Sequence, residues 1–310
     1  MPCTWADGTT GLHLPQTPGH TALTGSFLLG VGRPGGTPVA GRTQTSSGRA
    51  DLVGVEREQV VDGGAVFAPA AAVLAVPSGA LDLRVDGHVH TGFASGRDSV
   101  GVIVMAADRA GLTAVTFADQ VGPDTAWLPA YADAVRRAQQ RTELVLRVSA
   151  EVEVIQPDGW LAWPADLGDL EAVSVAVSRL PMSDGSYGTR DVRAMLASGL
   201  LSPTRLAEIV VEVTIRGIER ASRYAPTQLA RPLSLLTRVG VDDDDLPPEL
   251  VSRLAEACVA TGTVVELSEA WRSPSPLTVG VLRAAGVSMV AASDARYAAE
   301  VGRWQYLRGL

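Results

Sequence analysis

The sequence predicts an α/β fold in which a parallel β-sheet is surrounded by helices. Three observations support this. From Leu81 onward, short apolar segments typical of strands alternate with longer segments of helical periodicity, over about 230 residues. Seven segments have strand character, and polar or charged residues recur where these segments end. Seven strands favour a closed or nearly closed barrel over an open sheet, although periodicity alone does not separate the two.

Residues 1–80 precede this pattern and differ from it. They are rich in Gly, Pro, Thr and Ala and lack sustained periodicity, so we expect a low-complexity, disordered or irregular extension. A G-x-G-x-x-G match runs from Gly30 to Gly35, but the following "GTPVAG" cannot open the helix that a dinucleotide site requires. The predicted domains are therefore an extension over 1–80 and a barrel over 81–310.

The elements of the barrel follow in order along the chain. The predicted strands cover residues 81–89, 112–119, 144–154, 171–178, 226–232, 262–268 and 287–294. The clearest helical patterns cover residues 98–111, 127–140, 202–222 and 247–261. In barrels built this way, catalytic residues gather at the C-terminal ends of the strands. Each strand end is therefore a place to look for chemistry.

Composition excludes several functions. The net charge is −8, and all 26 basic residues are arginines. Without lysine there can be no Schiff base and no Walker lysine, and the acidic balance argues against a nucleic-acid surface. Cys3 and Cys258 are too few and too distant for a disulfide framework, and no segment reaches the ~18 apolar residues of a membrane span. These features predict a soluble cytoplasmic protein, and they leave the oligomeric state open.

The first strand end carries a candidate metal site. His88 and His90 point to the same side of an extended chain, because side chains alternate with a period of two. Glu151 on the third strand and Asp294 at the end of the seventh would bring carboxylates to the same end of a barrel. Nitrogen and oxygen ligands of this kind suit zinc, manganese or iron. An isolated H-x-H more often marks two hydrogen-bonded structural histidines, and it is the carboxylates on later strands that favour a metal.

Taken in series, these segments resemble the polymerase and histidinol phosphatase (PHP) superfamily. The motifs are "VDGHVHTGFASGRD", "AGLTAVTFADQ", "VSAEVEV", "LEAVSVAVS", "TGTVVELS" and "AAGVSMVAASDAR". The resemblance runs from about Leu81 to the C-terminus. It implies a distorted seven-stranded (β/α)7 TIM-like barrel and hydrolysis of phosphoesters with up to three divalent metals.

Four residues match metal ligands of the family. His88 and His90 match its opening H-x-H, Glu151 matches a glutamate that bridges metals, and Asp294 matches the aspartate of the closing S-D-A-H motif. The resemblance therefore implies one site, for one divalent ion. Asp119, from the family's T-D-H motif, and Glu151 are the expected catalytic carboxylates.

Other family ligands are replaced in this chain. Gln120, Ser178, Arg231 and Arg296 stand where the family has histidines. Our hypothesis is that the two arginines replace lost cations in holding a phosphate group, with Gln120 and Ser178 beside them. The alternative is that the arginines pair with Glu151, Glu153 or Asp294 and close the site.

Three functions are compatible with this pattern. The first is a histidinol-phosphatase-like phosphoesterase with one metal, acting on a small phosphomonoester. The second is a non-catalytic barrel that binds an anionic ligand or partner through Arg231 and Arg296. The third is a hydrolase of another ester or an amide that uses one activated water. A serine-hydrolase triad is disfavoured, because His88 and His90 are the only histidines after residue 80.

Overall fold

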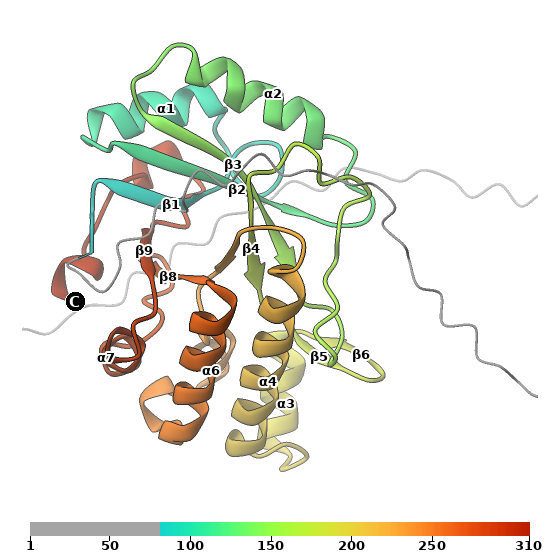
Figure 1. Cartoon of the computed structure of the whole chain (residues 1–310). Coiled ribbons are helices and arrows are strands. Elements are labelled where there is room, and N and C mark those ends of the chain that lie inside the picture. The colour runs from blue at the N-terminus through green and yellow to red at the C-terminus, as the bar shows by residue number, and fades with distance from the viewer. Residues whose placement is uncertain (1–80) are drawn as a thin grey trace, which may run out of the picture. The chain divides into compact units, whose positions relative to one another are not determined.

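The computed structural model of the chain describes residues 81–310. The predicted extension, with its Gly30–Gly35 motif, lies outside the described residues. Among residues 81–310, seven parallel strands form one sheet in the order β1-β2-β3-β4-β7-β8-β9 (Figure 1). The strands are β1 (Val85–Val89), β2 (Ala114–Val121), β3 (Val145–Glu153), β4 (Ala172–Ala176), β7 (Thr227–Leu229), β8 (Val264–Ser268) and β9 (Met289–Ala292). Each of the seven predicted strands is present.

The two edge strands of the sheet meet at their C-terminal ends. The Asp294 N–H donates to the His88 carbonyl at 3.0 Å, and the His90 N–H donates to the Ala295 carbonyl at 2.9 Å. A parallel bridge joins Val89 and Ala295. Gly87 permits this approach, because a Cβ there would lie 2.8 Å from the Val290 side chain of β9. The sheet is therefore a nearly closed, distorted (β/α)7 barrel, as predicted.

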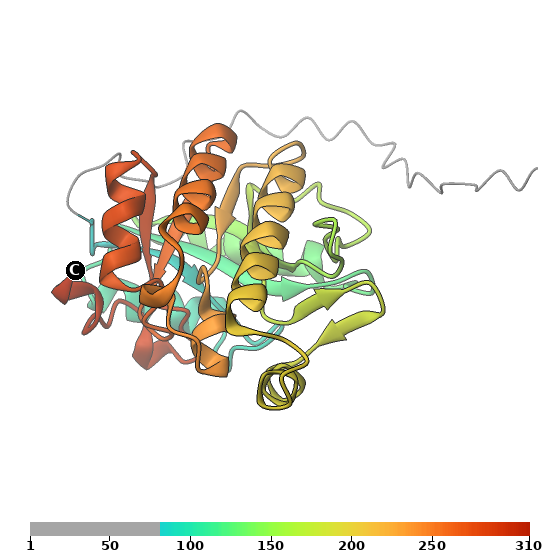
Figure 2. The same ribbon diagram turned by 90° about the horizontal axis from the view of Figure 1, so that it is seen from below.

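Helices cover the outside of the barrel. They are α1 (Val100–Arg109), α2 (Leu128–Gln139), α3 (Thr189–Ala197), α4 (Pro203–Ala221), α5 (Ser234–Val239), α6 (Pro248–Thr261) and α7 (Pro276–Ala284). Helices α1 and α2 lie over β1–β3, and α4, α6 and α7 lie side by side (Figures 1 and 2). Among residues 81–310, no helix has the length and apolar character needed to cross a bilayer.

Some elements were not predicted from the sequence. An antiparallel hairpin, β5 (Leu180–Met182) and β6 (Gly185–Tyr187), follows β4, and α3 and α5 lie in segments without an assigned element. Three short 3-10 helices, η1 (Asp243–Asp245), η2 (Ala298–Glu300) and η3 (Leu307–Gly309), complete the described chain. These elements are too short to show a hydrophobic period clearly.

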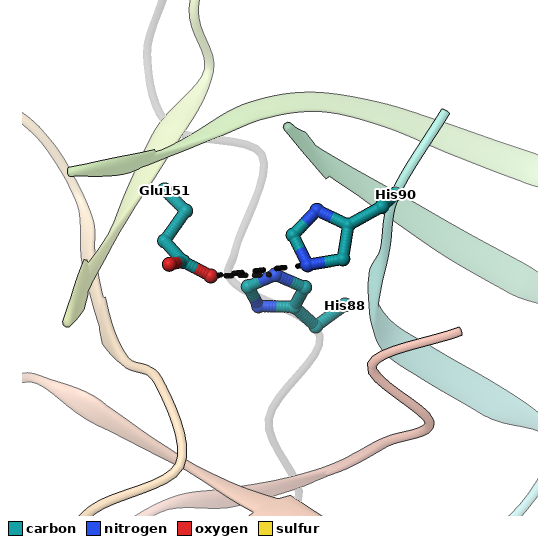
Figure 3. Close-up of side chains that lie close together, drawn as sticks. All are labelled: His88, His90 and Glu151. Atoms are coloured by element: carbon teal, nitrogen blue, oxygen red, sulfur yellow. Dashed lines mark ion pairs between the residues drawn. The ribbon is translucent and has the colours of Figure 1, made fainter. Parts of the chain in front are cut away.

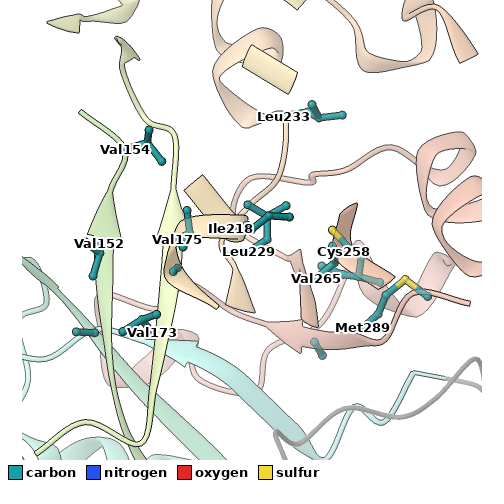
Figure 4. Packing of buried hydrophobic residues seen from close by; sticks show 14 of the residues in the cluster. Val152, Val154, Val173, Val175, Ile218, Leu229, Leu233, Cys258, Val265 and Met289 are labelled. Atoms are coloured by element: carbon teal, nitrogen blue, oxygen red, sulfur yellow. The ribbon is translucent and has the colours of Figure 1, made fainter. Parts of the chain in front are cut away.

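The apolar core lies between the barrel and its helices. Val173 and Val175 of β4 point outward and pack with Ile218 of α4, whereas Ser174 between them points into the barrel (Figure 4). Helix α4 packs closely against the strands because it carries Gly217, where a Cβ would lie 2.7 Å from the Val154 side chain. Strand residues therefore alternate between an apolar outer face and a polar interior, and the polar interior holds the candidate site.

Candidate metal centre

His88 and His90 lie inside the barrel at the end of β1. Both are fully buried, and their ring centroids are 4.8 Å apart. They share one face of the strand, while Gly87 and Val89 face the other way. The alternation expected from the H-x-H spacing thus places both imidazoles in the polar interior.

Glu151 reaches the two histidines from β3. Its Oε2 lies 3.3 Å from His88 Nε2 and 3.9 Å from His90 Nε2 (Figure 3). One ligand atom from each of the three residues lies within 4.8 Å of the others. Gln120, paired with Glu151 in the β2–β3 register, donates from Nε2 to Glu151 Oε1 at 3.1 Å. This cluster of His88, His90 and Glu151 could hold a metal ion.

Asp294 joins the cluster from the end of β9. Its Oδ1 is 2.9 Å from His90 Nε2, and its Oδ2 accepts a hydrogen bond from Trp271 Nε1. The Asp294 backbone is left-handed, with φ of 53°. This conformation is uncommon for a residue with a Cβ and typical of functional sites that surrounding contacts hold in place.

Glu266 of β8 orients the imidazole ring of His88. His88 Nδ1 is 2.8 Å from Glu266 Oε2, while Ser174 Oγ and Gln228 Nε2 donate to Glu266 Oε1 at 2.7 and 2.9 Å. With Nδ1 engaged, His88 presents Nε2 to Glu151. Carboxylates commonly hold metal-binding histidines in this way. Sequence reasoning gave Glu266 no role, and the polar residues Ser174 within β4 and Gln228 within β7 were the available signal.

Arg231 follows β7 and packs directly against the cluster. Its Nη2 and Nη1 lie 2.5 and 2.6 Å from the two oxygens of Glu151. Nη1 is also 3.5 Å from Asp294 Oδ2, and Nη2 donates to Ser178 Oγ at 2.9 Å. The Arg231 side chain is only 5% exposed. Its guanidinium thus acts as a countercharge for two of the expected metal ligands.

The structure brings Asp119 to this centre, but it gives the Arg296 side chain no polar contact with the cluster. Asp119 accepts hydrogen bonds from the N–H of Thr91, at 2.8 Å, and from its hydroxyl, and its Oδ1 is 3.7 Å from His90 Nδ1. Arg296 is half-buried in the segment after β9, and its guanidinium has no hydrogen bond or ion pair within residues 81–310. Glu153, the other carboxylate of β3, accepts hydrogen bonds from the backbone N–H groups of Ser178 and Arg179 instead of from Arg231.

The electrostatics keep two carboxylates of the cluster ionised. Burial alone would raise the pKa of Glu151, but Arg231 and His88 hold that pKa well below its usual range. Burial also opposes ionisation of Asp294, yet His90, His88 and Arg231 lower its pKa to about 2. Burial raises the pKa of Glu153 to about 7. Glu151 and Asp294 are therefore anionic near neutral pH, as metal ligands must be.

The donor set fits one divalent ion. Within residues 81–310, the buried His88 Nε2, which faces Glu151, has no hydrogen-bond partner, whereas His90 Nε2 is 2.9 Å from Asp294 Oδ1. Neighbouring ligand atoms around a tetrahedral zinc ion lie about 3.3 Å apart, given bonds of about 2.0 Å. The 3.3 and 3.9 Å distances from Glu151 to the two histidines are close to this value. An ion there would share Glu151 with Arg231, so the two cations compete for one carboxylate.

Comparison with known proteins gives structural likenesses only. No protein-family model matches the chain, and no curated protein sequence does. A candidate histidinol phosphatase from Listeria monocytogenes matches with 12% identity and a TM-score of 0.57, over 71% of this chain and 97% of its own. A histidinol phosphate phosphatase from Lactococcus lactis, in complex with zinc, L-histidinol and phosphate, has 11% identity and a TM-score of 0.46, over 69% and 86%. The first likeness shows a shared fold, in agreement with the distorted (β/α)7 barrel expected from the sequence.

Proposed function

We propose that the chain is a metal-dependent phosphoesterase that hydrolyses a small phosphomonoester with a single divalent ion. The observation that carries this proposal is the convergence of His88 Nε2, His90 and Glu151 Oε2 inside the barrel, with His88 oriented by Glu266. Asp294 is the proposed fourth ligand. The shared fold with a candidate histidinol phosphatase supports the choice of substrate class.

The proposed roles are metal binding for four residues and catalysis for two carboxylates. A bound ion supplies Lewis-acid polarisation and lowers the pKa of a water molecule. His88, His90, Glu151 and Asp294 would hold the ion, which is zinc, manganese or iron according to its nitrogen and oxygen donors. Asp119, 3.7 Å from His90, is the second proposed catalytic carboxylate beside Glu151.

Phosphate binding is proposed for the residues that replace family histidines. The Arg296 guanidinium has no partner within residues 81–310, so it is available to an anion. Gln120 and Ser178 both contact the Arg231–Glu151 pair and lie beside the proposed ion. Arg231 would contact phosphate only by giving up part of its pairing with Glu151. It is therefore the proposed link between metal binding and phosphate binding.

The test combines elemental analysis with a phosphatase assay on p-nitrophenyl phosphate. We expect about one zinc, manganese or iron per wild-type chain, and loss of both metal and hydrolysis in His88→Ala. Glu151→Gln, which preserves shape, should also lose both. His20→Ala is the control for removal of a histidine outside the proposed ligands and should keep both. Undiminished hydrolysis in His88→Ala would refute the metal mechanism.

A second function is favoured by the internal contacts of Arg231, which occupy both of its terminal nitrogens. Its two terminal nitrogens contact Glu151, Asp294 and Ser178, which is the arrangement of a site closed by an internal ion pair. The chain would then be a non-catalytic barrel that binds an anionic ligand through Arg296. Absence of metal in the wild type, together with phosphate binding by calorimetry that is lost in Arg296→Ala, would select this function over hydrolysis.

A further inference from the structure

A second concave site lies on the outside of the barrel, between α1 and the C-terminal segment. The cavity has a volume of about 800 Å³ and is bounded by the outer face of α1 and by residues 298–308. None of the residues of the candidate metal centre lines it. Its size is within the range of cavities that enclose small organic ligands, roughly 300–1,000 Å³.

The floor of the cavity is apolar. Val102 and Ala106 of α1 line it with Ala298 and Ala299, and Val301 and Trp304 also border it but are only 2% and 5% exposed. The Trp304 indole N–H donates to the Leu83 carbonyl at 2.8 Å, so its polar atom is satisfied away from a ligand. The floor therefore offers mainly aliphatic surface, from Val102 and the alanines, and no unsatisfied indole group.

The rim of the cavity carries unpaired positive charge. Arg109, Arg303 and Arg308 line it and are exposed, and none forms an ion pair within residues 81–310. Arg109 uses only its Nε, which donates to the Met105 carbonyl at 3.1 Å, so both terminal nitrogens are free. Among the described residues that line the cavity there is no aspartate or glutamate.

The acidic residue of the C-terminal segment is engaged by backbone groups. Glu300, which lies in the same segment, accepts hydrogen bonds from the backbone N–H groups of Arg296 and Tyr297 at 2.9 and 3.1 Å. A chain with a net charge of −8 thus places around one cavity three arginines that form no ion pair within residues 81–310. Guanidinium groups bind carboxylates and phosphates through paired hydrogen bonds, and such groups are well suited to hold an anionic head.

We propose that this cavity binds an organic anion. A carboxylate, phosphate or sulfonate head would contact Arg109, Arg303 and Arg308, and an aromatic or aliphatic body would lie against Val102 and the alanines of the lining, Ala106, Ala298 and Ala299. This site is separate from the proposed phosphoesterase centre, and its test needs no enzymatic activity.

The probe is anilinonaphthalene sulfonate, an anion with an aromatic body whose fluorescence rises on binding to apolar surface. The full chain should bind it saturably at one site. N-phenylnaphthylamine, which has the same rings without the sulfonate, should bind at least roughly tenfold more weakly, because it lacks the charge that the arginines recognise. Equal affinity for the two probes would overturn the proposal.

Two matched triple variants separate specific recognition from net charge. Each replaces three exposed arginines by alanine: Arg109, Arg303 and Arg308 in the first, and Arg137, Arg141 and Arg190, which do not line the cavity, in the control. The first should weaken binding of the sulfonate roughly tenfold or more, and the control less than about twofold. Equal losses in both would mean non-specific attraction and would overturn the proposal.

A further variant blocks the floor and keeps the arginines. Ala106→Trp, on the half-buried outer face of α1, should fill part of the cavity and abolish saturable binding of both probes. Circular dichroism would check that each variant keeps its fold. Unchanged sulfonate binding in Ala106→Trp would place the probe elsewhere and overturn the proposal, even if the triple variant did not fold.

Discussion

Replacing Arg231 by methionine tests whether its guanidinium and a metal ion compete for Glu151. Methionine keeps much of the length of the side chain but removes the contacts at 2.5 and 2.6 Å to Glu151 and the one at 2.9 Å to Ser178. The Arg231 and Glu151 side chains are 5% and 2% exposed. Removing one partner of a pair buried this deeply costs about 3–5 kcal/mol, because the other charge stays buried without compensation.

The assay is thermal unfolding with a chelator and with added zinc. In the chelator, Arg231→Met should unfold roughly 6–20 °C below the wild type, at about 2–4 °C per kcal/mol for a domain of this size. Zinc should raise the unfolding temperature of the variant more than that of the wild type. In the variant the ion is the only cation that balances the negative charges of Glu151 and Asp294, apart from the histidines. A tenfold gain in zinc affinity adds about 1.4 kcal/mol of stabilisation at saturating metal.

A surface pair supplies the control. Arg220 contacts Asp158 at 3.5 Å, and the two side chains are 29% and 58% exposed. Arg220→Met should cost less than about 1 kcal/mol and leave the effect of zinc unchanged. If Arg231→Met were as stable as the wild type in chelator, or if zinc stabilised both equally, the competition between guanidinium and metal would be refuted.

Three further predictions concern other buried polar groups. Glu266→Gln should weaken zinc binding 10–100-fold, because the amide orients His88 less strongly than the carboxylate, and unchanged affinity in a chelator competition would contradict this. Burial raises the pKa of Asp86 from 3.8 to about 6. The folded state therefore holds this proton more tightly than the unfolded state, and the group costs up to about 3 kcal/mol of stability as pH rises from 3.8 to 6. Asp86→Asn should lack that decline in urea unfolding measured from about pH 4 to pH 7, whereas a decline equal to the wild type's would exclude Asp86 as its source. Burial also raises the pKa of the Cys258 thiol to about 12. In Cys3→Ser, a disulfide reagent at about pH 8 should therefore modify Cys258 only after unfolding, and rapid labelling of the native protein would show that the thiol is accessible.

The sequence by itself determined the order of strands and helices along the chain and several residues of the candidate site. Alternating apolar and polar residues within the strands fix which side chains enter the barrel, so His88, His90 and Glu151 were identified from local spacing. Asp294 was expected beside them because strand ends gather at one end of a barrel, and its side chain lies 2.9 Å from His90 in the structure. Short elements such as α3 and the β5–β6 hairpin escaped prediction, since their few residues carry too little periodicity.

Only the tertiary structure decided what each charged residue faces. The sequence left Arg231 and Arg296 equivalent, as cations for phosphate or as partners for carboxylates. The folded structure gives them different surroundings. Arg231, whose backbone is left-handed with φ of 35°, pairs with Glu151. Arg296 keeps its guanidinium free within residues 81–310. Glu266 likewise gains its role from contact with His88, 178 residues earlier in the chain. Local spacing specifies the face of a strand, but contacts between distant strands depend on barrel closure, which no local pattern encodes.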